Sequence, residues 1–249
     1  MSGHSHWARI KHKKGVTDAR RGRLWSKLAR IIIVAARGGG DPKDNLPLRY
    51  AIDKAREANM PKDTIENAIK KGTGELGGVS YETVRYEGYG AGGVAILCDA
   101  LTDNRNRTAP EIKKVFERHG GALGSAGCVA WMFSNKGLVV VPLKAADEDR
   151  IAEIALDAGA DDYKQVDDVW EITCEPAVYE PLRAALTAAG ITPQSSELSM
   201  VPSNTVPVDA AAGRKVLNLI ESLEEQDDIQ NVYSNFELPD DVLAALGQG

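Results

Sequence analysis

Apolar residues recur at helical spacing early in the chain. Positions on one arc of a helix are Leu24, Leu28, Ile31, Ile32 and Ala35. A cap at Thr17 or Asp18 can start this helix, since a short oxygen-bearing side chain accepts from free backbone N–H groups. The run Gly38-Gly39-Gly40 ends it.

Two shorter helices are predicted to follow, over 47–59 and 61–71. The first ends at Met60-Pro61, because proline disfavours a helical conformation for the residue before it. The same proline suits the first turn of the next helix. Together the three helices predict an amino-terminal helical domain over 1–75.

The pattern changes to strands and helices from Tyr81 onward. Strands are predicted over 84–87, 94–101 and 129–133, with a helix over 110–119. Thr108 and Glu111 have the spacing of a capping box for that helix. The segment 88–93 contains GxGxxG, but it precedes an aliphatic run and therefore predicts a hairpin turn rather than a dinucleotide loop.

Residues 137–202 predict the order strand, helix, strand, strand, helix, strand, which is typical of ferredoxin-like domains. A helix over 209–225 and a strand over 229–235 complete the earlier set. We therefore expect an α+β protein in which a ferredoxin-like domain, 135–203, is inserted into a discontinuous α/β domain formed by 79–134 plus 204–238.

Charge is distributed unevenly, although the total is only -6. Residues 1–37 hold ten Lys or Arg and one acidic residue, whereas residues 76–249 hold 13 basic and 28 acidic residues. Such asymmetry is typical of a basic binding element carried by an acidic body. Nucleic acid is the expected partner, because cations near phosphates release counterions.

The candidate contacts continue from the amino terminus onto the first helix. The expected phosphate contacts are Lys11, Lys13, Lys14, Arg20, Arg23, Lys27 and Arg30, and Trp7 or His6 can stack on a base. Arg105 and Arg107 lie in a polar loop that either binds phosphate or only caps a helix. The pattern does not distinguish DNA from RNA.

Other classes of function lack support in the sequence. The three cysteines are far apart and predict neither a disulfide framework nor a zinc site, which suits a reducing compartment. Neither a catalytic triad nor a phosphate-binding P-loop is recognised, so we expect no enzyme activity, no cofactor, no metal and no small-molecule substrate. No secretory signal or membrane span is recognised, and a cytoplasmic location is expected.

The sequence resembles the YebC/PmpR family, which is related to the mitochondrial translational activator of cytochrome c oxidase. The resemblance rests on the opening Met1–Lys14 and on four further stretches: Asn59–Asp63, Tyr86–Tyr89, Thr102–Thr108 and Gly120 to Phe133. Two small departures are His6, where the family usually has Lys, and Trp25, where Phe is usual.

The resemblance implies a three-domain bacterial protein without catalytic residues. It also implies one of two roles: a transcriptional regulator that binds promoter DNA, or a translation factor that acts on ribosomes or messenger RNA, for example by relieving stalls at proline runs. The resemblance assigns no binding site at the level of residues.

Overall fold

The computed structural model describes residues 18–77, 80–166 and 168–238, with the backbone alone described at 18–20. Contacts between Cα atoms divide the chain into two compact units. One unit spans Trp131–Thr205, and the other joins the segments before and after it. The chain mixes helices with antiparallel sheets and is α+β, as predicted. The finer division into three domains stays a prediction.

Three helices begin the described chain: α2 (Asp18–Ala36), α3 (Leu46–Glu57) and α4 (Lys62–Gly72). Their bounds agree with the sequence prediction to within two residues at each end. The apolar face of α2 differs from the prediction, because Leu24 is 44% exposed whereas Ile33 and Ala36 are buried with Leu28 and Ile32. The buried arc is rotated because both α3 and α4 pack against α2.

Gly72 allows α4 to approach α2 closely. A Cβ atom at this position would lie 2.5 Å from the carbonyl oxygen of Ile33 and 2.6 Å from the Cβ of Ala36. Such distances are too short for any side chain, so glycine is needed here for packing and not only to end the helix.

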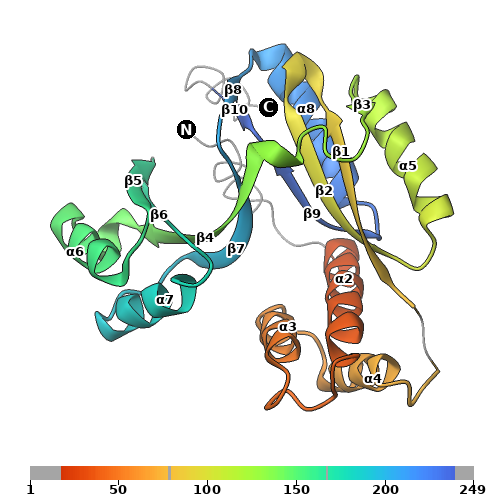
Figure 1. Ribbon diagram of the computed structural model, residues 1–249, viewed down its shortest axis with the longest axis horizontal. Coiled ribbons are helices and arrows are strands. Elements are labelled where there is room, and N and C mark those ends of the chain that lie inside the picture. Colours follow the sequence, from red (N-terminus) through yellow and green to blue (C-terminus); the bar gives the residue numbers. More distant parts are fainter. Residues whose placement is uncertain (1–17, 78–79, 167, 239–249) are drawn as a thin grey trace. The chain divides into compact units, whose positions relative to one another are not determined.

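The unit formed by the segments before and after Trp131–Thr205 also contains a four-stranded antiparallel sheet in the order β3-β1-β2-β9 (Figure 1). Its strands are β1 (Glu82–Tyr89), β2 (Ala95–Thr102), β3 (Ala122–Leu123) and β9 (Ile229–Ser234). Helices α5 (Arg105–Arg118) and α8 (Ala210–Glu224) pack on one face through a shared core that includes Phe116 and Leu219. A separate parallel pair is formed by β8 (Val206–Pro207), which precedes α8, and β10 (Phe236–Glu237), which follows β9.

Two local predictions were wrong. Helix α5 begins at Arg105, five residues before the predicted start, because Asn104 rather than Thr108 is its cap. The side chain of Asn104 accepts a hydrogen bond from the amide of Arg107. The predicted strand over 129–133 is instead a short 3-10 helix, η2 (Ala130–Met132), after which β4 starts at Phe133. The predicted hairpin turn over 88–93 is confirmed, since β1 and β2 pair on either side of it.

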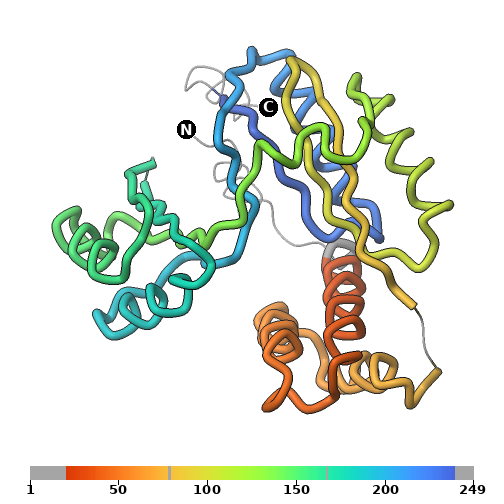
Figure 2. Tube along the Cα trace, viewed as in Figure 1, coloured from red at the N-terminus to blue at the C-terminus, as the bar shows by residue number. Residues whose placement is uncertain are grey.

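The Trp131–Thr205 unit has its own sheet in the order β5-β6-β4-β7. Its elements are β4 (Phe133–Pro142), α6 (Glu148–Ala158), β5 (Asp162–Val166), β6 (Val169–Cys174), α7 (Tyr179–Ala188) and β7 (Ser195–Pro202). The chain enters through β4 and leaves through β7, which run side by side as an antiparallel pair (Figure 2). Both helices pack on one face of the sheet around Ile151, Ile172 and Leu182.

Candidate nucleic-acid interface

The structure describes only part of the predicted binding set. Trp7, Lys11, Lys13 and Lys14 lie outside the described residues. Arg20 lies in the first turn of α2, where only the backbone is described. The remaining five residues are on α2 and at the start of α5: Arg23, Lys27, Arg30, Arg105 and Arg107.

Arg23, Lys27 and Arg30 form one face of α2, here called the basic face, because their spacing of four and three residues follows the helical repeat. All three side chains contact the segment 224–228, here called the acidic turn, which joins α8 to β9. Lys27 donates to the carbonyl oxygen of Glu224, and Arg23 lies 3.6 Å from the carboxylate of Glu225.

Arg30 makes the most buried of these contacts. Its guanidinium donates to the carboxylate of Asp228 at 2.9 Å and also to the carbonyl oxygen of Asp227. The side chain of Arg30 is 17% exposed and that of Asp228 only 7%. A charge pair so far from solvent is weakened little by dissolved salt, whereas the more exposed pair of Arg23 with Glu225 is screened.

Asp228 also binds the beginning of α5. Arg107 donates to its second carboxylate oxygen at 2.8 Å, and the hydroxyl of Thr108 lies 2.6 Å from the same oxygen. Burial by itself would raise the pKa of Asp228. The hydrogen bonds from Thr108 and Arg107 and the charges of Arg30 and Arg107 outweigh burial, so the pKa lies below its ordinary value.

The loop 103–108 makes capping and charge contacts within the chain. Asn104 caps α5, and Arg107 also contacts the carboxylate of Asp103 at 3.0 Å. Both arginines are exposed, but Arg105 has a 3.6 Å pair with the half-exposed Glu82, whereas Arg107 pairs at 2.8 Å with the buried Asp228. Of the two arginines, Arg105 has the geometry that could exchange an intramolecular partner for a phosphate.

The acidic turn is the feature that reasoning from sequence missed. A signal was present, since Glu224-Glu225-Gln226-Asp227-Asp228 is a dense acidic run directly after a helix. Carbonyl groups at a helix end also carry partial negative charge, which adds to the attraction for cations. Nothing in the linear sequence, however, places this run against α2.

A second buried carboxylate organises the glycine-rich segment before η2. Glu87 accepts hydrogen bonds from the amides of Gly127, Val129 and Ala130 at 2.7–2.9 Å. Burial would raise the pKa of Glu87, but the three backbone hydrogen bonds together with Arg85 lower it below the ordinary value. This carboxylate holds the loop in place, and its hydrogen bonds are directed within the chain.

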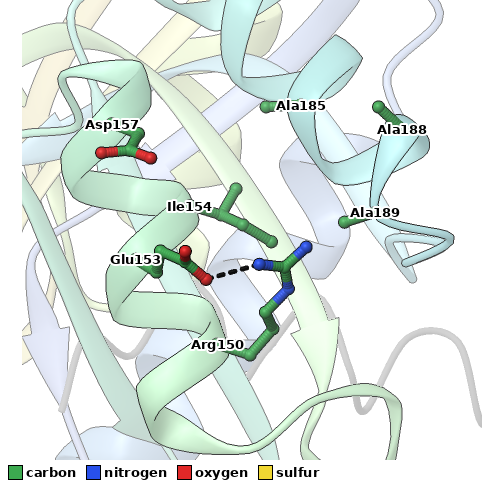
Figure 3. Close-up of a pocket in the computed structure, with 7 residues that line it drawn as sticks. All are labelled: Arg150, Glu153, Ile154, Asp157, Ala185, Ala188 and Ala189. Atoms are coloured by element: carbon green, nitrogen blue, oxygen red, sulfur yellow. Dashed lines mark hydrogen bonds and ion pairs between the residues drawn. The ribbon is translucent and has the colours of Figure 1, made fainter.

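A cleft on the Trp131–Thr205 unit does not resemble a polyanion site. It lies between α6 and α7, with Ile154 and three alanines along it and Arg150, Glu153 and Asp157 at its edge (Figure 3). Arg150 is paired with Glu153. This cleft therefore has more acidic than basic side chains, which would repel phosphates.

The residues that the structure describes show neither a metal-binding cluster nor a membrane-spanning helix. They contain no cluster of His, Cys, Asp and Glu side chains arranged to hold a metal ion. Within the same residues, none of the helices combines the length and the apolar character needed to cross a bilayer.

The fold and the contacts define an α+β protein in which an amino-terminal basic helix is held against the acidic turn of an antiparallel sheet domain. Comparison with known families agrees in both parts of the chain. Residues 5–75 match the TACO1/YebC protein N-terminal domain, and residues 81–236 match the TACO1/YebC second and third domain. The chain belongs to the TACO1/YebC family.

Similar proteins cover nearly the whole chain. A probable transcriptional regulatory protein of Dictyoglomus turgidum is 51% identical over 99% of this chain and 100% of its own length. One of the same description from Pelotomaculum thermopropionicum is 52% identical over 96% and 100%. The crystal structure of a conserved hypothetical protein from Aquifex aeolicus matches with a TM-score of 0.82 and 46% identity, covering 94% of this chain and 98% of that one.

Proposed function

We propose that this protein is a non-enzymatic regulator of transcription that binds DNA through its basic amino-terminal segment. The observation that carries the proposal is the excess of nine positive charges in residues 1–37, set against an acidic remainder. The relatives described as probable transcriptional regulatory proteins support the regulatory part.

The proposed contacts fall into two groups. Lys11, Lys13, Lys14 and Arg20 bind phosphates, and Trp7 stacks on a base where one is accessible. Arg105 adds a phosphate contact at the edge of the sheet domain, because its present pair with Glu82 is exposed and weak. Arg107 acts indirectly by holding Asp228.

The experiment compares the full chain with two triple variants. One replaces Lys11, Lys13 and Lys14 with glutamine. The matched control replaces Lys62, Lys70 and Lys71, which are exposed lysines of α4, and so removes the same charge. Fluorescence anisotropy with a labelled DNA duplex of about three helical turns measures affinity across a salt series.

We expect the amino-terminal variant to bind DNA more weakly, with the slope of log K against log salt reduced by about one unit for each lysine removed. The α4 control should keep most of the slope. Equal slopes for the wild type and the amino-terminal variant would contradict the proposed contacts, and absence of binding by the wild type would contradict the function.

A role in translation is the second candidate, and the charge of the Trp131–Thr205 unit favours it. This unit holds 13 acidic and five basic residues, so it suits a basic protein surface better than a nucleic acid. Single-stranded RNA of the same sequence, tested at the same salt, separates the two candidates. Tighter binding to RNA than to duplex DNA, together with co-sedimentation with ribosomes, would replace transcription by translation.

A further inference from the structure

The basic face of α2 is occupied by another part of the same chain. Its partners are carboxylates and backbone carbonyl oxygens, the same type of acceptor that a phosphate offers to arginine and lysine. We propose that the acidic turn 224–228 competes with nucleic-acid phosphates for the basic face, so that binding of a polyanion releases α2 from the sheet domain. This inference rests on the proposed function and concerns how that function is regulated.

The contact between α2 and the sheet domain is mainly polar. The apolar core of the helices includes Ile32 and Leu48, and that of the sheet includes Ile96 and Phe116. Within the described part of the chain, no side chain belongs to both cores. Tyr81, just before β1, is the apolar side chain that joins the helical core, and it also lies 5.7 Å from the guanidinium of Arg30. The charged groups of a polyanion can replace the acceptors of a polar contact of this type, whereas they cannot replace a shared hydrophobic core.

The strength of the contact changes along the basic face. Arg23 and Glu225 are 38% and 52% exposed and lie 3.6 Å apart. Arg30 and Asp228, two helical turns later, are largely buried and lie 2.9 Å apart. A phosphate therefore displaces the carboxylate of Glu225 from Arg23 more easily than that of Asp228 from Arg30, because the first pair is longer and more exposed.

Removing a carboxylate of the acidic turn should therefore strengthen nucleic-acid binding. Asp228→Asn removes the central charge, and Glu225→Gln removes the exposed one. Glu111→Gln is the matched control, because it changes the net charge equally and lies exposed on α5. Each variant is tested as the full chain with the labelled DNA duplex and with single-stranded RNA.

We expect Asp228→Asn to bind about tenfold more tightly than the control if the basic face is occupied about nine-tenths of the time. Glu225→Gln should bind about twofold more tightly, because the exposed pair that it removes contributes little free energy. Circular dichroism checks that each variant is folded. Should Asp228→Asn fail to fold, the comparison of Glu225→Gln with the control decides the matter.

A distance measurement tests the release directly. Spin labels at Leu24→Cys on α2 and Asn218→Cys on α8, with Cys128 replaced by serine, report the separation of the two helices. The separation should increase when the duplex is added. Salt alone should change it much less, because the buried pair of Arg30 with Asp228 is weakened little by dissolved salt.

The outcomes distinguish this inference from the proposed function. A wild type that binds neither nucleic acid overturns the proposed function, and the separation of the labels measured with heparin, a sulfated polyanion, then still tests the competition for the basic face. If the wild type binds but the acidic-turn variants match the control, or the separation stays constant, the competition is overturned and the function stands.

Discussion

The guanidinium of Arg30 and the carboxylate of Asp228 are 198 residues apart in sequence and lie 2.9 Å apart in the structure. This pair connects α2 to the turn between α8 and β9, and Arg107 and Thr108 bring α5 to the same carboxylate. A residue predicted to contact phosphate is thus part of the internal framework of the protein.

Replacing Asp228 with alanine should destabilise the protein. The change leaves Arg30 and Arg107 without their shared carboxylate, and breaking a buried pair by removing one partner costs about 3 kcal/mol in the free energy of unfolding. Urea denaturation measures the loss. Asp227→Ala is the control, since Asp227 contributes its backbone carbonyl, and its exposed side chain should change stability by no more than about 0.5 kcal/mol. Equal losses in both variants would argue against the pair.

Acid should weaken the same cluster. The pKa of Asp228 is lowered in the folded chain, so its contribution to stability is complete above the ordinary aspartate pKa and is lost as the pH falls through the lowered value. The wild type should therefore lose stability more steeply than Asp228→Asn below the ordinary carboxyl range. Urea midpoints measured from neutral pH down to about pH 3 compare the two slopes. Parallel pH profiles would contradict the lowered pKa.

Gly72→Ala should destabilise the helical segment, because the added methyl group would lie 2.5 Å from the carbonyl oxygen of Ile33. Overpacking of this type costs about 1–3 kcal/mol. Gly22→Ala makes the same chemical change in α2, where a Cβ meets nothing within 4 Å, and it should stabilise the helix by up to about 1 kcal/mol. The midpoint of thermal unfolding, monitored by circular dichroism, should fall for Gly72→Ala and rise for Gly22→Ala. A stabilised Gly72→Ala would refute the packing argument.

Glu87→Gln should loosen the loop before η2. The glutamine keeps one acceptor oxygen but turns the other into a donor, which then faces the backbone amides that Glu87 now satisfies. An unsatisfied buried group costs about 1–3 kcal/mol. Hydrogen exchange at Gly127, Val129 and Ala130 should become faster.

Glu82→Gln on the same strand is the control for this change, since its carboxylate is half exposed and pairs loosely with Arg105. In the Glu82→Gln variant, the amides of residues 127–130 should exchange hydrogen at the same rate as in the wild type. Unchanged protection in Glu87→Gln would mean that the loop is held by other contacts.

The sequence pattern predicted helices and strands well where their position depends on residues close together in the chain. The helix over 209–225 was predicted from its apolar spacing and is α8, and the strands of residues 137–202 were found with errors of a few residues at their ends. The start of α5 was missed because two residues with capping side chains, Asn104 and Thr108, precede the predicted helix. The choice was settled by burial, since Thr108 lies inside the protein against Asp228.

The sequence by itself determined the helices and strands, the α+β class and the gathering of positive charge near the amino terminus, because each depends on residues close together in the chain. It also determined that Arg23, Lys27 and Arg30 share one face of a helix. Only the tertiary structure decided what that face touches, because helical periodicity sets the direction of side chains and not the identity of the surface opposite them. That surface, the turn ending in Asp228, is brought to α2 by a sheet whose strands come from before and after the Trp131–Thr205 unit in the sequence.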